Sequence, residues 1–156
     1  MWPFTKKVKV ELFDGRKVDL VPTAKEVLAL PDCTLTMPPI ELAEWAKYSF
    51  NGKRIRKKDV PPKHDWKHLQ VCARRVGLWA NGIMRIEQIK DPDIVALRPF
   101  CQLKIGERAC QHAQNVSQEH WKNKAIQRIP LKTCPLEQTC HCNWVTLSKR
   151  DVERAR

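Results

Sequence analysis

The sequence lacks the motifs that mark many nucleotide-binding and hydrolytic enzymes. It has 5 glycines among 156 residues, and no Gly-rich phosphate loop, G-x-S-x-G elbow or H-E-x-x-H motif occurs in it. So few glycines leave little room for turns that cradle a nucleotide. The sequence therefore argues against an enzyme. The enzymatic alternative that stays open is a metal-dependent nuclease using His112 or His120 with Glu107 or Glu119.

Long hydrophobic runs are also missing. No stretch approaches the roughly 18 consecutive apolar residues of a membrane-spanning helix. The opening "MWPFTKKVKV" lacks the apolar core of a secretory signal. We therefore expect a cytoplasmic protein without a membrane partner, in which the 7 cysteines are reduced. An odd number of cysteines cannot pair completely in any case.

Acidic residues are scarce relative to basic ones. The chain has 29 Lys and Arg against 17 Asp and Glu, a net charge of +12. Between residues 46 and 75, ten basic residues face two acidic ones, a local net charge of +8. Such a cluster predicts contact with nucleic acid or another polyanion, because released counterions drive binding to phosphates. A solvated basic face is the alternative. The predicted contact residues are Lys53, Arg54, Arg56, Lys57, Lys58, Lys63, Lys67, Arg74 and Arg75.

The remaining composition is that of a globular chain, with 42% hydrophobic residues. In "VKVELFDGRKVDLV" apolar and polar residues alternate on both sides of Asp14-Gly15, which predicts a β-hairpin. We expect Thr23 to cap a short helix that follows. Helical apolar spacing in residues 39–50 and 66–80 predicts two central helices, the second capped by Asp65 and ending near Asn81-Gly82.

Short β-branched runs after Gly82, such as "IMRIEQIK", "DIVALRPF" and "CNWVTL", predict strands. The fold class expected is α+β: a small mixed domain with an N-terminal β-hairpin, central helices and a cysteine-rich C-terminal segment held by a metal. The predicted division is a basic α+β body over residues 1–99, a zinc-binding segment over 100–147 and a charged flexible tail over 148–156.

Four cysteines lie close together in the last third of the chain. Cys110, Cys134, Cys140 and Cys142 have the spacing C-x23-C-x5-C-x-C. Thiolates from two separated segments can enclose a tetrahedral zinc ion, so these four are the predicted metal ligands. Competing ligands are Cys101, His112, His120 and His141. A redox pair is less favoured because no C-x-x-C is present. Cys33 and Cys72 are interpreted as structural residues, the latter on an apolar helical stripe.

The same segment carries a resemblance. Its Ala109-Cys110, Pro130-Leu131, the three later cysteines and Arg150-Asp151 resemble the C-terminal segments of a group of short uncharacterised bacterial proteins. These segments share an "AC" pair, a Leu/Pro-rich approach to a cysteine, a C-x-C and a charged tail. The resemblance covers the last third of the chain, brings no activity with it, and supports these four cysteines over Cys101 and the histidines.

The sequence thus predicts a small basic protein stabilised by zinc and contacting nucleic acid or another polyanion. The alternative is a protein-interaction adaptor whose zinc is purely structural, and the nuclease is the third reading. Salt dependence of binding separates the first two, because only phosphate contacts give a steep slope.

Overall fold

The computed structural model describes residues 6–12, 15–88, 92–101, 130, 132, 134–136 and 142–154. The chain divides into two compact units. The first comprises residues 1–81 with 135–137, and the second comprises residues 82–134 with 138–156. Helices and antiparallel β-strands occur together, so the predicted α+β class is confirmed.

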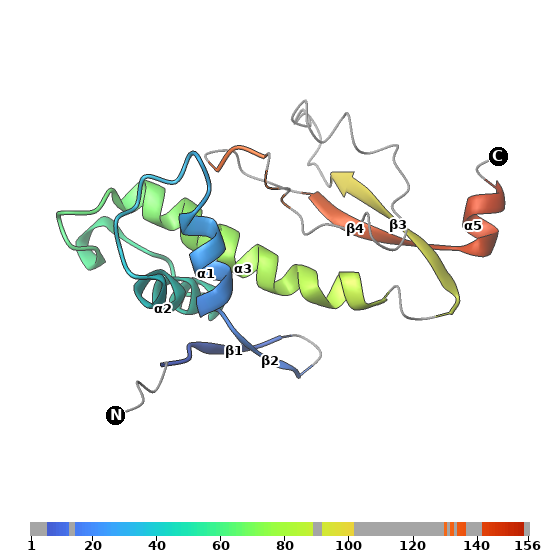
Figure 1. The fold of residues 1–156 in the computed structure, drawn as a ribbon, viewed down its shortest axis with the longest axis horizontal. Helices are drawn as coiled ribbons and strands as arrows, with labels where there is room; N and C mark the ends of the chain where they lie inside the picture. Colours follow the sequence, from blue (N-terminus) through green and yellow to red (C-terminus); the bar gives the residue numbers. More distant parts are fainter. Residues whose placement is uncertain are drawn as a thin grey trace. The chain divides into compact units, whose positions relative to one another are not determined.

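The first unit begins with the predicted hairpin (Figure 1). Strand β1 (Lys9–Glu11) pairs antiparallel with β2 (Lys17–Asp19). Gly15 lies in the connection with φ of 85°, a conformation that glycine adopts without steric cost. The alternating apolar side chains of the first strand turn inward, with Val8, Val10 and Leu12 buried.

Helix α1 (Val21–Leu28) starts earlier than its predicted cap. Thr23 lies inside the first turn and is buried, so it is not the cap residue. Pro22 fits this first turn because proline supplies a helical φ where no amide partner is needed. The Asp19 carboxylate accepts the amides of Val8 and Val21, each at 3.1 Å. It thereby ties the start of α1 to the hairpin.

Two further helices complete the first unit. Helix α2 (Pro39–Phe50) ends at Asn51-Gly52 as predicted, and Gly52 has φ of 83°. A single 3-10 turn, η1 (Lys57–Asp59), lies in the connection that follows. Helix α3 (Trp66–Gln88) is capped by the predicted residue, because Asp65 Oδ1 accepts the Lys67 amide at 3.0 Å.

Helix α3 does not end at Asn81-Gly82, and "IMRIEQIK" is not a strand as far as residue 88. This prediction was wrong because Asn-Gly tolerates a left-handed conformation without requiring it. The Met, Arg, Glu and Gln that follow are favourable helix formers. The apolar stripe of the helix supplies core residues: Leu69, Cys72, Ala73, Val76, Trp79 and Ala80.

The second unit contains the other sheet. Strand β3 (Ile94–Cys101) pairs antiparallel with β4 (Cys142–Ser148), with a register shift between Ile94 and Ala96 (Figure 1). Both strands were predicted. Helix α5 (Lys149–Arg154) follows within the charged tail. Its first turn is held by Asp151, whose carboxylate accepts the Ser148 amide at 2.9 Å. The domain boundaries predicted at residues 99 and 147 fall within β3 and β4, and that division stays a prediction.

Candidate metal centre

Three side chains that can ligate a metal meet in the first unit. Cys33 lies in the connection between α1 and α2, where its amide donates to the Leu30 carbonyl at 3.0 Å. His68 and Cys72 lie four residues apart on α3, a spacing that places two side chains on one face of a helix. The ligand atoms of all three lie within 4.8 Å of one another. We call this group the Cys33–His68–Cys72 cluster.

Two distances in the cluster are close to those of a metal-bound set. The two sulfur atoms are 3.8 Å apart, and Cys72 Sγ is 3.7 Å from His68 Nε2. Around a tetrahedral zinc, bond lengths of about 2.3 Å to sulfur and about 2.0 Å to nitrogen place two sulfurs about 3.8 Å apart and a sulfur and a nitrogen about 3.5 Å apart. The separation is too long for a disulfide, whose sulfurs lie about 2.05 Å apart. The cluster is therefore a pair of thiols and an imidazole with metal-ligand spacing.

A neighbouring amide orients the imidazole. Thr34 donates its backbone N–H to His68 Nε2 at 3.0 Å. Nε2 is thus an acceptor, and its single lone pair is directed to the Thr34 amide while Cys72 Sγ lies 3.7 Å away. The lone pair that a metal requires lies on the nitrogen nearest the sulfur. A bound metal would compete with Thr34 for it, so a small shift of the half-buried loop at Cys33 would accompany binding.

The electrostatic setting keeps Cys72 protonated in the absence of a metal. Burial raises the pKa of its thiol far above the ordinary value, and Cys33 and Asp32 raise it further, while Arg75 lowers it. A thiol of this kind is a poor nucleophile, because the reactive form is the thiolate. A cation bound at this position would stabilise the charged form of Cys72, which burial otherwise disfavours. The cluster thus fits metal binding better than redox chemistry.

Residues next to the ligands hold a distant segment of the same unit. Asp32 Oδ2 accepts the Leu136 amide at 2.8 Å. Arg75 Nη2 donates to the Pro135 carbonyl at 3.3 Å, and its guanidinium lies 5.7 Å from the centre of the Trp79 ring. Leu136 is 2% exposed. The cluster therefore sits beside a tight junction between α3, the loop at Asp32 and residues 135–136.

The predicted C-terminal ligand set is only partly within the described residues. Cys110 and Cys140 lie outside them, as do the competing His112, His120 and His141. Cys134 is half-buried. Cys142 on β4 is the register partner of Cys101 on β3, which places two of the predicted or competing ligand positions opposite each other. The four-cysteine zinc site stays a prediction.

Eight of the nine predicted polyanion contacts are exposed. They are Lys53, Arg54, Arg56, Lys57, Lys58, Lys63, Lys67 and Arg74, which we call the basic set. Arg75 differs, because it is 3% exposed and faces the protein interior. Two members contact aromatic rings: Lys53 Nζ lies 5.4 Å from the Tyr48 ring centre, and Lys67 Nζ lies 6.0 Å from that of Trp66.

Sequence reasoning missed the cluster. Cys72 was interpreted as packing, and it is indeed buried, but a buried position does not exclude a ligand. The available signal was His68-x3-Cys72 on one helical face. Nothing local pointed to Cys33, whose sulfur reaches Cys72 across 39 residues of sequence.

Comparison with known proteins does not assign the chain to a family. No family model, curated protein or solved structure matches the chain. Among the described residues, no helix is both long enough and apolar enough to span a bilayer.

Proposed function

We propose that the chain is a zinc protein in which Cys33, His68 and Cys72 bind one Zn²⁺. The observation that carries the proposal is the spacing of 3.8 Å between the sulfurs and 3.7 Å between sulfur and Nε2. Thiolate and imidazole ligands favour zinc over the hard cations magnesium and calcium, which take oxygen ligands. Three protein ligands leave one position of a zinc tetrahedron for water or a further side chain.

The proposed role of the ion is structural. It would join the α1–α2 connection to α3, because the ligands come from both and one of them is fully buried. Metal binding must displace the proton of the Cys72 thiol, so the metal-binding energy becomes folding energy only when that proton is released. Occupancy should therefore rise with pH in the neutral range.

Metal analysis of variants tests this proposal. Protein purified under reducing conditions should contain zinc, and Cys33→Ser, Cys72→Ser and His68→Gln should each lower the content by about one equivalent. Cobalt substituted for zinc should show a thiolate-to-metal absorption band that the two serine variants weaken. Cys134→Ser is the comparison variant: it leaves the cluster intact and should keep the absorption band of the cluster, whereas loss of zinc in this variant alone would favour the predicted C-terminal site. Unchanged zinc in all three cluster variants would contradict the proposal.

A second function is favoured by the basic set. We propose that the protein binds nucleic acid through these eight exposed side chains, which lie within residues 53–74. Only two acids, Asp59 and Asp65, lie in that region, so its net charge stays strongly positive. The adaptor and nuclease alternatives have no comparable support among the described residues.

Salt dependence tests the second function. Replacing Lys53, Arg54, Arg56, Lys57 and Lys58 by Gln should reduce the slope of log affinity against log salt by up to about 4. All five side chains are exposed, so the fold should survive, which circular dichroism would check. An adaptor that recognises protein would show no steep slope. An unchanged slope in the variant would place the nucleic-acid contact elsewhere.

A further inference from the structure

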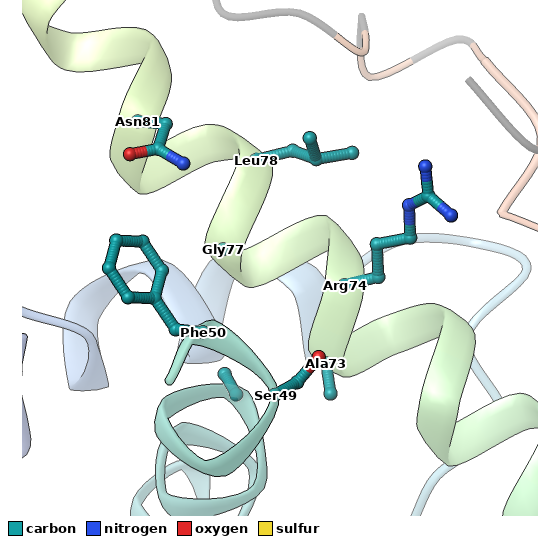
Figure 2. Close-up of a pocket in the computed structure, with 8 residues that line it drawn as sticks. Ser49, Phe50, Ala73, Arg74, Gly77, Leu78 and Asn81 are labelled. Carbon is teal, nitrogen blue, oxygen red and sulfur yellow. The ribbon is translucent and has the colours of Figure 1, made fainter. Parts of the chain in front are cut away.

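A small pocket lies between the end of α2 and the middle of α3 (Figure 2). Its volume is about 210 Å³. This is below the roughly 300–1,000 Å³ of sites for drug-sized ligands, so it suits one planar group and not a whole cofactor. The lining residues all belong to the first unit: Ala46, Ser49, Phe50, Ala73, Arg74, Gly77, Leu78 and Asn81.

Gly77 forms part of the pocket wall and is not required by the packing around it. A Cβ atom placed there would meet only Phe50 Cδ2, at 3.7 Å, which is an ordinary contact. Glycine inside a helix is unfavourable relative to alanine, and close approach of a ligand to the backbone is one use of it. The missing side chain therefore leaves open space on α3 that the protein's own atoms do not fill.

The pocket combines an aromatic ring, polar edges and a positive charge. Figure 2 shows the Phe50 ring on one side of Gly77, with Leu78 and Arg74 extending on the other. The Ser49 hydroxyl and the Asn81 carboxamide can each both donate and accept hydrogen bonds. A ring face and two such groups suit a planar heterocycle that carries donors and acceptors along its edge.

The charge around the pocket points to an anionic partner. Arg74 is an exposed member of the basic set and lines the pocket itself. Lys47 is exposed on α2, and Lys53 and Arg54 follow Phe50 directly after the Asn51-Gly52 turn. No acidic residue lines the pocket. A ligand that carries a planar heterocycle next to a phosphate would match both the pocket and the basic residues around it.

We propose that the pocket binds one unstacked base of a single-stranded nucleic acid whose phosphates contact the basic set. This inference rests on the proposed nucleic-acid function and narrows it. Bases within a duplex are stacked and present only their edges, whereas a single strand can turn a base onto an aromatic side chain. The protein should accordingly prefer single strands over duplexes of equal charge.

Gly77→Ala is the central test, because it moves stability and binding in opposite directions. The added methyl group fits without a clash and favours the helix, so the thermal unfolding midpoint should rise by about a few degrees. The same methyl group occupies space that the base needs. Affinity for a single-stranded oligonucleotide should fall at least about five-fold, the lower end of what stacking of one base contributes. A loss of binding through general damage to the fold would instead accompany a lower midpoint.

An abasic oligonucleotide of the same length is the matched ligand, because it keeps the phosphates and lacks the bases. The unmodified protein should bind it less tightly than the normal strand, and Gly77→Ala should not weaken its binding further. Asn81→Ala, at an exposed position of the pocket, should likewise weaken only binding of the normal strand.

The outcomes separate the inference from the function on which it rests. Equal affinity of the unmodified protein for normal and abasic strands, or no effect of both variants on the difference between them, would overturn the base pocket. Steep salt dependence would meanwhile keep the nucleic-acid function. Absence of salt-dependent binding to either strand would overturn both.

Discussion

Arg74 and Arg75 are neighbours in sequence but differ in solvent exposure. Arg74 is exposed and lines the α2–α3 pocket. Arg75 is 3% exposed, donates to the Pro135 carbonyl and lies over the Trp79 ring. Consecutive residues on a helix point about 100° apart, which follows from 3.6 residues per turn. The difference teaches that the helical face, and not the residue type, decides whether a charged side chain is packed in the interior or faces solvent.

The contrast extends along the first half of α3. Its inner face carries His68, Cys72 and Arg75, which contact segments far away in the sequence. Its outer face carries Lys67 and Arg74, which are exposed. Substitutions on the inner face should change stability and metal content. Those on the outer face should change salt-dependent binding.

The largest effect on stability is expected at Leu136, the buried residue that follows the Pro135 carbonyl contacted by Arg75. Leu136→Ala should lower the free energy of unfolding by about 2–5 kcal/mol, because the side chain is buried and its removal leaves a cavity. Urea unfolding would measure this change. Lys132→Ala, at an exposed position earlier in the sequence, should change stability by less than about 0.5 kcal/mol. A salt slope of nucleic-acid binding that fell with Leu136→Ala would break the separation of the two faces.

The two arginines provide the direct comparison. Arg75→Ala should cost about 1–3 kcal/mol of stability, because it leaves the Pro135 carbonyl without this donor and removes the contact with Trp79. Arg74→Ala should change stability by less than about 0.5 kcal/mol. Its effect should instead be a decrease of about 0.7–0.9 in the salt slope, one phosphate contact. The opposite assignment of these two effects would refute the proposed roles.

Alkaline pH should affect the inner face of the metal-free protein. Burial, followed by Cys33 and Asp32, raises the pKa of the Cys72 thiol above its ordinary 9.0, although Arg75 opposes the shift. The folded state therefore keeps a proton that the unfolded state loses. The contribution to stability is fully present below pH 9.0 and declines above it, by at most about 1.4 kcal/mol per pH unit.

Chelated protein unfolded in urea at several pH values would measure this decline, and Cys72→Val should remove the Cys72 contribution to it. With saturating zinc, stability should instead rise with pH at lower pH, because zinc binding releases the thiol proton. A decline of equal size in Cys72→Val would assign it to other groups, such as the lysines.

Local signals predicted the local parts of this structure. The alternation in residues 8–12, the Asn51-Gly52 helix end and the Asp65 cap each depend on neighbours within a few residues, and each is present. Charge clustering likewise located the basic set, since exposed charges need no partner. The orientation of Arg75 needed the tertiary packing on Trp79 and Pro135.

The Cys33–His68–Cys72 cluster shows why the rest was not predictable. Clustering of cysteines in sequence drew attention to the C-terminal four, whereas the described cluster joins Cys33 to a helix that begins more than 30 residues later. Only the packing of the α1–α2 connection on α3 brings them together. The pocket at Gly77 depends in the same way on where Phe50 of α2 lies against α3.

The smallest predicted effect on stability is at Asp65, which caps α3 below residues of both faces. Its carboxylate accepts the amides of Lys67 at 3.0 Å and His68 at 3.4 Å, one residue from each face. Asp65→Ala should lower stability by about 1 kcal/mol through loss of the cap. Asp65→Ser should recover most of this, because serine caps nearly as well.

Loosening of the first turn in Asp65→Ala should also weaken zinc binding through His68. Removal of a negative charge from the outer face should strengthen nucleic-acid binding slightly. Urea unfolding, zinc competition and salt titration of both variants would measure the three quantities. If zinc affinity in Asp65→Ala stayed unchanged while stability fell, the first turn of α3 would not position His68, and the cluster would be held by Cys33 and Cys72 alone.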